Sequence, residues 1–179
     1  NDNVVGHIDE RTMHMRYSLG LDLGTSSLRC LLLSQTGSVV AVASAEYSIL
    51  VPSAGWAEQD PLDWWKAACH AVQEVLHVSG VNPADIVGVG LSGQMHGTVM
   101  LDEDNQIVAP AIIWSDGRSG DQCETFRNGF GEEHLYQLTG MPVATGFMGP
   151  SLLWVKENQP DQFRRIHTVC LPKDYLRLR

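Results

Sequence analysis

The segment that decides the fold is YSLGLDLGTSSLRCLLLSQTGSVVAVASAEY, residues 17–47. It contains three runs typical of β-strands: an alternating stretch over 17–22, an apolar stretch over 28–34, and a stretch rich in Val and Ala over 38–47. The breaks between these runs are short, and QTGS at 35–38 has the composition of a hairpin turn. The sequence therefore predicts three consecutive strands that pair as an antiparallel meander.

A helix is predicted after the meander, because Asp60 suits an N-cap and Pro61 suits the first helical position. Gly80 and Pro83 are expected to end it. Apolar residues at helical spacing predict a stripe against the sheet, made of Trp65, Ala68, Val72, Val75 and Leu76, with Lys66, Gln73 and Glu74 facing water. The apolar run over 86–91 then predicts a central strand that is covered on both faces.

The remainder of the chain predicts an alternation of short strands and helices. Strands are expected over 98–101, 107–114 and 168–171, and helices over 117–128, 132–139, 150–158 and 172–179. We expect a single domain over 17–179 that is incomplete at its C-terminal end, because no capping glycine or polar tail follows the last helix. Residues 1–16 carry mixed charge without an apolar period, so we expect a flexible leader or extension there.

Composition excludes several classes of protein. The chain has 179 residues, a formal net charge of -9 and no run of Lys and Arg that could neutralise a row of phosphates, so nucleic acid is not expected as a partner. No apolar stretch is long enough to span a bilayer. The four cysteines are scattered without a CxxC pair, which favours reduced thiols and small buried apolar roles. We expect a compact, cytoplasmic protein that contacts no membrane.

The first candidate site is DLGTSS, residues 22–27, between the first two predicted strands. A glycine there permits a tight turn, so backbone N–H groups and hydroxyls can converge on phosphate oxygens, and a strand-end carboxylate can hold Mg²⁺ directly or through water. A simple hairpin without a ligand is the alternative. Arg29, on the next strand, could reach a phosphate, but an exposed position on the strand is the favoured interpretation.

The second and third candidates follow later strands. In SGQMHG, residues 92–97, Gln94 and His96 could hydrogen-bond sugar hydroxyls, or the histidine could face solvent or a backbone carbonyl. In WSDGR, residues 114–118, an aromatic ring, a carboxylate and a guanidinium crowd together, as they do in many sugar sites. A structural Asp–Arg pair that caps the next helix is equally compatible with that motif.

Taken together, five segments carry a family resemblance. DLGTSS, SGQMHG, WSDGR, GFMGPSLLWVKEN and LPKDYLRLR occur in the order found in FGGY carbohydrate kinases, which the chain resembles from about residue 17 to residue 179. QMHG and LPKDYLR look like the xylulokinases of that family in particular. The chain departs from the family pattern at Ser151, where a Lys is usual, and at Met148, where a small hydroxyl residue or Pro is usual.

The resemblance implies an α/β fold of the actin-like ATPase, ribonuclease H-like type, whose amino-terminal lobe has a mixed sheet with flanking helices. It also implies ATP, Mg²⁺ and transfer of the γ-phosphoryl group to a ketopentose, with D-xylulose as the expected acceptor and D-xylulose 5-phosphate as product. The implied site residues are Asp22 on the phosphate and Mg²⁺ side, Gly24, Thr25 and Ser26 for the cofactor, and Gln94, Met95, His96 and Asp116 for the sugar.

In this family the catalytic base is an aspartate farther along the chain, beyond Arg179, so residues 1–179 alone are expected to be inactive. Another pentulose or a sugar acid remains open as substrate, and so does a non-catalytic sugar-binding or sensor domain. An actin-like ATPase or assembly protein is a further alternative, against which QMHG argues. A homodimer is also left open.

Overall fold

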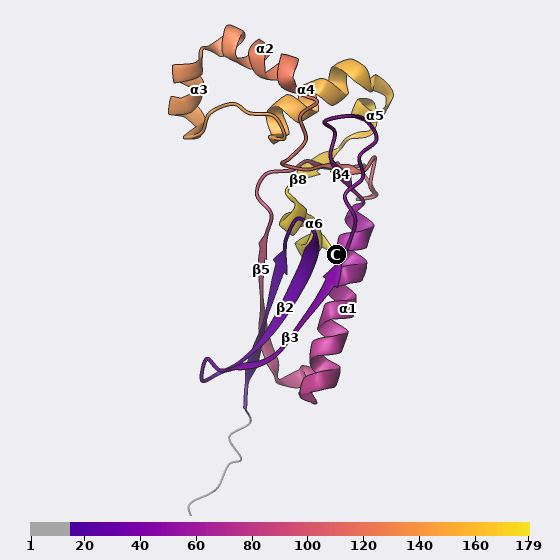
Figure 1. Ribbon diagram of the computed structural model, residues 1–179, viewed down its shortest axis with the longest axis vertical. Helices are drawn as coiled ribbons and strands as arrows, with labels where there is room; N and C mark the ends of the chain where they lie inside the picture. The colour runs from indigo at the N-terminus through magenta and orange to yellow at the C-terminus, as the bar shows by residue number, and fades with distance from the viewer. Residues whose placement is uncertain (1–14) are drawn as a thin grey trace, which may run out of the picture.

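The computed structural model describes residues 15–179, so the leader predicted over 1–16 falls almost wholly outside the described residues. A four-stranded sheet forms the lower part of the molecule (Figure 1), in the order β3 (Val39–Glu46), β2 (Ser27–Ser34), β1 (Tyr17–Leu23), β5 (Ile86–Gly93). The β1–β2 and β2–β3 pairs are antiparallel, whereas β1 and β5 are parallel. The predicted meander is therefore confirmed, and the sheet is mixed.

Helix α1 (Pro61–Ser79) packs along β2 and β3 and has the predicted ends. Asp60 Oδ1 accepts a hydrogen bond from the Leu62 N–H at 2.9 Å, and Gly80 ends the helix in the left-handed conformation with φ of 67°. The predicted water-facing residues are exposed. The predicted stripe is confirmed in part: Ala68 and Val75 are buried, whereas Trp65, Val72 and Leu76 are only partly buried, and the fully buried Trp64 was not predicted. The residues that α1 buries are Pro61, Trp64, Ala67, Ala68, Ala71 and Val75.

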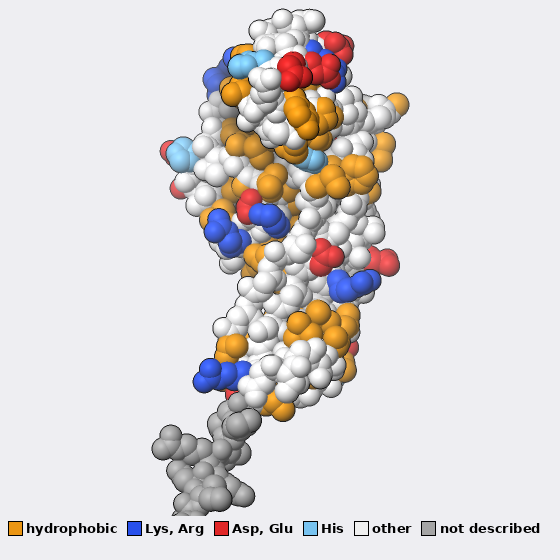
Figure 2. Space-filling model, turned by 90° about the vertical axis from the view of Figure 1, so that its left-hand side faces the viewer, with side chains coloured by type: hydrophobic (Ala, Val, Ile, Leu, Met, Phe, Trp, Pro, Cys, Tyr) orange, Lys and Arg blue, Asp and Glu red, His pale blue; other side chains and the backbone are white. Residues whose placement is uncertain are grey.

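The prediction that residues 86–91 form a central strand covered on both faces is wrong. Within the described part of the chain, β5 lies at the edge of the sheet, paired only with β1. Val87 and Val89 are 61% and 59% exposed, because α1 covers β2 and β3 rather than β5. Seen from the β5 side, hydrophobic side chains are visible on the surface of both the sheet and the upper helices (Figure 2).

Most of the second half of the chain forms short strands and helices above the sheet, whereas the last helix, residues 172–178, packs beside β5 and α1 (Figure 1). Two small antiparallel ladders pair β4 (Glu58–Gln59) with β7 (Ala111–Ile112) and β6 (Val99–Leu101) with β8 (Thr168–Cys170). The strand predicted over 107–114 is therefore reduced to two residues and an isolated Leu101–Ile107 bridge. The remaining elements are the 3₁₀ turn η1 (Pro83–Asp85) and the helices α2 (Gly120–Phe130), α3 (Glu132–Thr139), α4 (Met148–Asn158), α5 (Pro160–Arg165) and α6 (Pro172–Leu178).

The predicted later helices are confirmed within a few residues at their ends, and α5 was not expected. Only one residue separates the end of α4 from Pro160, where α5 begins. Hydrophobic periodicity alone does not distinguish two helices that lie so close in sequence. No helix in residues 15–179 is long and apolar enough to cross a membrane.

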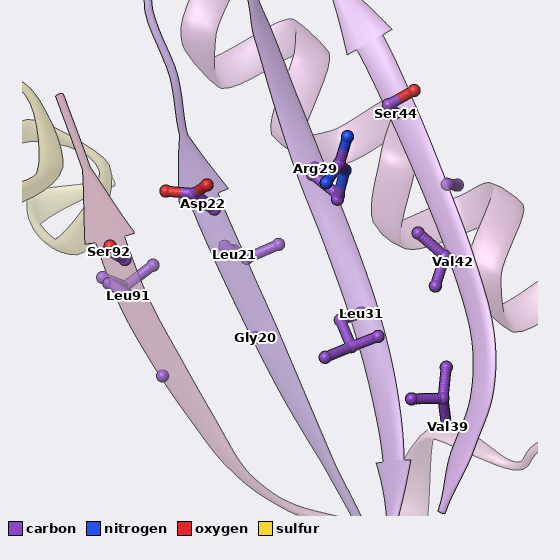
Figure 3. A pocket seen from close by; sticks show the side chains of 12 residues that line it. Gly20, Leu21, Asp22, Arg29, Leu31, Val39, Val42, Ser44, Leu91 and Ser92 are labelled. Carbon is purple, nitrogen blue, oxygen red and sulfur yellow. The ribbon is translucent and has the colours of Figure 1, made fainter.

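The main core lies between one face of the sheet and α1, and it includes Tyr175 of α6. A smaller core around Met100, Ile112 and Val155 joins the upper helices to β6 and β7. The opposite face of the sheet has a hollow of about 840 Å³ (Figure 3). Its polar side chains, Asp22, Arg29, Ser44 and Ser92, lie toward the end of the sheet where β1 and β5 stop, and apolar side chains such as Leu31 and Val42 lie below them.

Candidate functional site

The β1–β2 hairpin is built around Gly24. The Gly24 N–H donates to the Ser27 carbonyl at 3.0 Å, and a Cβ at this position would lie only 3.0 Å from that same oxygen. Tyr47 holds the hairpin from the end of β3, since its hydroxyl donates to the Gly24 carbonyl at 2.6 Å. Burial, and then the negative charge of Asp22, raise the pKa of Tyr47 far above its ordinary value, so the hydroxyl keeps its proton and remains a donor at neutral pH.

Thr25, at the tip of this hairpin, has hydrogen-bonding capacity left for a ligand. The indole Nε1–H of Trp114 donates to Thr25 Oγ1 at 3.0 Å. Because the indole is only a donor, the hydroxyl is the acceptor of this bond and its own proton is free to donate elsewhere. Within residues 15–179, no acceptor is recorded for the N–H groups of Thr25 and Ser26 either. Free donors converging on one turn are what an anion such as phosphate requires.

Asp22 stands at the end of β1, just before the hairpin. It lies in register with Arg29 of β2 and Ser92 of β5, and all three side chains are exposed on the face of the hollow (Figure 3). Arg29 therefore has the exposed strand position that was favoured for it. Among the described residues no cluster of three His, Cys, Asp or Glu side chains could enclose a metal ion. A single exposed carboxylate, next to hydrogen-bond donors that could hold a phosphate, fits Mg²⁺, because this ion keeps several waters and phosphate oxygens as ligands.

The loop after β5 carries Gln94, Met95 and His96. The Gln94 N–H donates to the Leu23 carbonyl at 2.6 Å, which ties this loop to the end of β1. Met95 is 66% exposed. His96 has a positive φ of 52°, which is uncommon for a residue other than glycine, and its ring stacks on Phe147 with centroids 3.7 Å apart. The loop therefore presents one exposed thioether and one imidazole held in a fixed orientation.

The segment before α4 reaches the same region because residue 146 is glycine. A Cβ on Gly146 would lie 2.2 Å from the Trp114 carbonyl oxygen, and its φ of 74° is in the left-handed region. This close approach brings Phe147 to His96 and the segment to Trp114, a residue that is 43% exposed. An aromatic face, an imidazole and a thioether thus gather where β5 and β7 end.

Asp116 and Arg118 form a buried brace. Asp116 is 1% exposed, and its Oδ2 accepts the Ala57 N–H at 2.6 Å. Arg118 pairs with Asp116 at 2.8 Å and with Glu58 at 2.7 Å, and its guanidinium lies 3.8 Å over the Trp56 ring. Of the two roles left open by the sequence, this geometry favours a structural Asp–Arg pair, because the carboxylate has little surface left for a sugar hydroxyl. The predicted capping of the next helix is not found, since α2 begins after Ser119 without a side-chain cap.

Reasoning from sequence missed Gln59, Trp56 and Phe147. Gln59 contacts both the hairpin and the Gln94 side chain, Trp56 stacks on Arg118, and Phe147 stacks on His96. The only local signal for the first two is the cluster GWAEQDP at 55–61, which ends with the N-cap and the first residue of α1.

The two departures from the family pattern lie on α4. Ser151 is fully buried there, and its hydroxyl has no recorded partner among the described residues. Met148 is the first residue of the helix. The helix keeps its buried contact with the smaller core through Val155. The two departures from the family pattern are therefore compatible with the packing of α4 against the smaller core.

Comparison with known proteins assigns the class. Residues 17–179 match the model of the FGGY family of carbohydrate kinases, N-terminal domain, and the chain belongs to this family. It is 42% identical to "Xylulose kinase" of Bacillus subtilis (strain 168), over 92% of this chain and 33% of that protein. It is 38% identical to "Xylulose kinase" of Escherichia coli (strain K12), over 90% of this chain and 32% of that protein. The chain therefore spans about a third of the length of these curated relatives.

Solved structures agree with this assignment. A "xyloylose kinase" from Brucella ovis superposes with a TM-score of 0.86 at 40% identity, over 91% of this chain and 34% of that one. Xylulose kinase from Rhodospirillum rubrum also gives 0.86, at 33% identity, over 91% of this chain and 33% of that one. The predicted actin-like, ribonuclease H-like α/β fold is confirmed.

Proposed function

We propose that the protein containing these residues is an ATP-dependent sugar kinase that transfers the γ-phosphoryl group to a ketopentose, D-xylulose, giving D-xylulose 5-phosphate. The observation that carries this proposal is the meeting of the hairpin and the QMHG loop at one end of the sheet. The Gln94 N–H bonds the Leu23 carbonyl and the Trp114 indole bonds Thr25, so a phosphate-type turn and a sugar-type loop are held side by side. The names of the relatives support xylulose as the acceptor.

The hairpin is proposed to bind the phosphates of ATP. Backbone N–H groups at Thr25 and Ser26, together with the Thr25 hydroxyl, would donate to phosphate oxygens, while Gly24 would shape the turn through its own bond to the Ser27 carbonyl. Asp22 would hold Mg²⁺, directly or through water, and the ion would neutralise part of the phosphate charge. Because this reaction depends mainly on positioning and charge stabilisation, the rigidity that Tyr47 and Trp114 give the hairpin is part of its function.

The QMHG loop is proposed to bind the sugar. His96, oriented by Phe147, and the Gln94 amide would hydrogen-bond hydroxyls, while Met95 and the exposed Trp114 ring would contact C–H faces. Asp116 would act on this site indirectly, by fixing the backbone at Ala57. The exposed ring and the exposed thioether give the loop an apolar surface of the kind a pentulose backbone can cover.

Proton removal from the accepting hydroxyl is proposed to need a carboxylate from outside residues 1–179, so these residues alone would not catalyse transfer. Asp22 is proposed to lie at the phosphate end and not to act as that base. The protein is proposed to act in the cytoplasm, where the four free thiols at Cys30, Cys69, Cys123 and Cys170 remain reduced.

The test is ADP release by the full-length protein with Mg·ATP and a panel of D-xylulose, L-ribulose, glycerol and gluconate, each repeated with His96→Ala. Turnover on xylulose that falls at least 100-fold in the variant would support both the reaction and the sugar loop. Turnover only on another member of the panel would support a sugar kinase and contradict D-xylulose as its substrate. Sugar binding without turnover on any member would instead favour a non-catalytic sensor.

A further inference from the structure

Gln59 is a buried amide that contacts both halves of the candidate site. It is the second residue of β4 and is 1% exposed. Its Nε2 donates to the Thr25 carbonyl at 2.7 Å, and its Oε1 accepts from Gln94 Nε2 at 2.9 Å. One side chain therefore joins the phosphate hairpin to the loop that follows β5.

The orientation of this amide is fixed by the chemistry of its neighbours. Trp64 Nε1 donates to Gln59 Oε1 at 3.1 Å, and an indole N–H has no ability to accept. The Thr25 carbonyl can only accept, so it faces the NH₂ group of the amide. Turning the amide over would place donor against donor at Trp64 and acceptor against acceptor at Thr25. Only a group with one donor face and one acceptor face fits this position.

The amide is anchored in the main core. Trp64 is fully buried in α1, and its ring packs edge-on against Tyr175 of α6 with centroids 6.5 Å apart. The Gln94 side chain depends on this anchor, because its Oε1 is buried and has no recorded partner among residues 15–179. Its bond to Gln59 is thus the side-chain hydrogen bond that sets its orientation.

We propose that Gln59 is a positioning residue that fixes the phosphate hairpin relative to the sugar loop, acting through Thr25 and Gln94 rather than touching either substrate. This inference rests on the proposed function, which assigns those two segments to the two substrates. A displacement of about 1 Å between reacting groups can cost about 100-fold in rate, so a rigid link between the segments would matter for transfer.

The test uses the full-length protein with Gln59→Met and a matched control, Gln122→Met. Gln122 is a second buried glutamine, 6% exposed in α2, and it donates to Glu157 at 2.7 Å among the upper helices (Figure 1). We expect kcat to fall about 10- to 100-fold in Gln59→Met and to stay within about twofold in Gln122→Met. Equal losses in the two variants, or no loss at position 59, would overturn the proposal.

A second variant separates positioning from general packing. In Gln59→Glu, burial raises the pKa of the new carboxyl group, and only its protonated form has the donor that Thr25 needs and the acceptor that Trp64 and Gln94 need. We expect the ratio of variant to wild-type kcat to rise at least about fivefold as the pH falls from 8 to 5.5. A flat ratio close to that of wild type would mean that the carboxyl stays protonated throughout and would support the pattern, whereas a flat ratio no higher than that of Gln59→Met would contradict it.

Hydrogen exchange gives a readout that does not depend on turnover. We expect peptides covering 22–28 and 92–97 to exchange about tenfold faster in Gln59→Met than in wild type, and to be unchanged in Gln122→Met. If wild type phosphorylates no sugar while this pattern holds, the proposed function fails and the link between the two segments stands. If turnover is present and exchange at both peptides is unchanged, the inference about Gln59 fails alone.

Discussion

Replacing Arg118 with Ala should cause a large loss of stability, because its buried charge pairs with two carboxylates. The Arg118 side chain is 2% exposed and pairs with Asp116, whose side chain is fully buried, and with Glu58, which is 14% exposed. Without the guanidinium, two carboxylates that are out of water face each other, and the Trp56 ring loses its stacking partner. Breaking a buried pair by removing one partner costs about 3–5 kcal/mol, and we expect a loss in that range.

The assay is urea unfolding of the full-length protein, followed by tryptophan fluorescence. The control is Arg164→Ala, which removes an arginine whose side chain is 69% exposed and whose partner Asp161 is 90% exposed. Exposed pairs contribute about 0–1 kcal/mol, so the control should be nearly neutral. If Arg118→Ala cost less than about 1 kcal/mol, the view of this cluster as a brace for the 55–59 segment would be refuted.

Three further results are expected. Phe147→Ala should raise the KM for the sugar about three- to tenfold, with the KM for ATP unchanged, because His96 loses a stacked ring; an equal rise in both constants would contradict a role confined to the sugar loop. Thr25→Val should lower kcat/KM for ATP at least about tenfold while Thr25→Ser stays within about threefold, since only serine keeps the hydroxyl; equal activity of the two variants would remove the hydroxyl from the mechanism. Burial raises the pKa of Cys30 from 9.0 to about 11. The unfolded thiol therefore ionises first, and the contribution of Cys30 to the unfolding free energy, constant below about pH 8, should fall by about 2 kcal/mol between pH 9 and 11. In urea titrations Cys30→Ala should lose this part of the slope, and identical slopes would contradict the assignment.

The elements that could be predicted from the sequence are those whose structure is set by residues close together in the chain. The meander could be predicted because its strands are neighbours in the chain and its turns are short, and α1 because Asp60, Pro61 and Gly80 mark its ends. The close approach of the hairpin and the loop after β5 also follows a general rule, that ligand-binding groups lie at the carboxyl ends of strands. These features need no knowledge of distant contacts.

Other features depend on such contacts and could not be predicted. An apolar run such as 86–91 does not reveal whether the strand has neighbours on both sides, so the edge position of β5 was missed. Trp64 and Trp65 lie about 100° apart on the helix, and apolar residues on either side of the stripe do not show which of them is fully buried. The acceptor on Gln59 that receives the Trp64 N–H is known only once β4 is placed. A glutamine in a two-residue strand has no sequence signature, which is why the link through Gln59 emerged only from the structure.

The most direct test of the account is phosphorus NMR of the full-length protein incubated with Mg·ATP and D-xylulose. We expect a phosphomonoester resonance that grows in step with ADP and is absent when the sugar is omitted. ADP formed together with inorganic phosphate and no sugar phosphate would contradict it, and would show instead an ATPase that uses the same hairpin without transferring phosphate to a sugar.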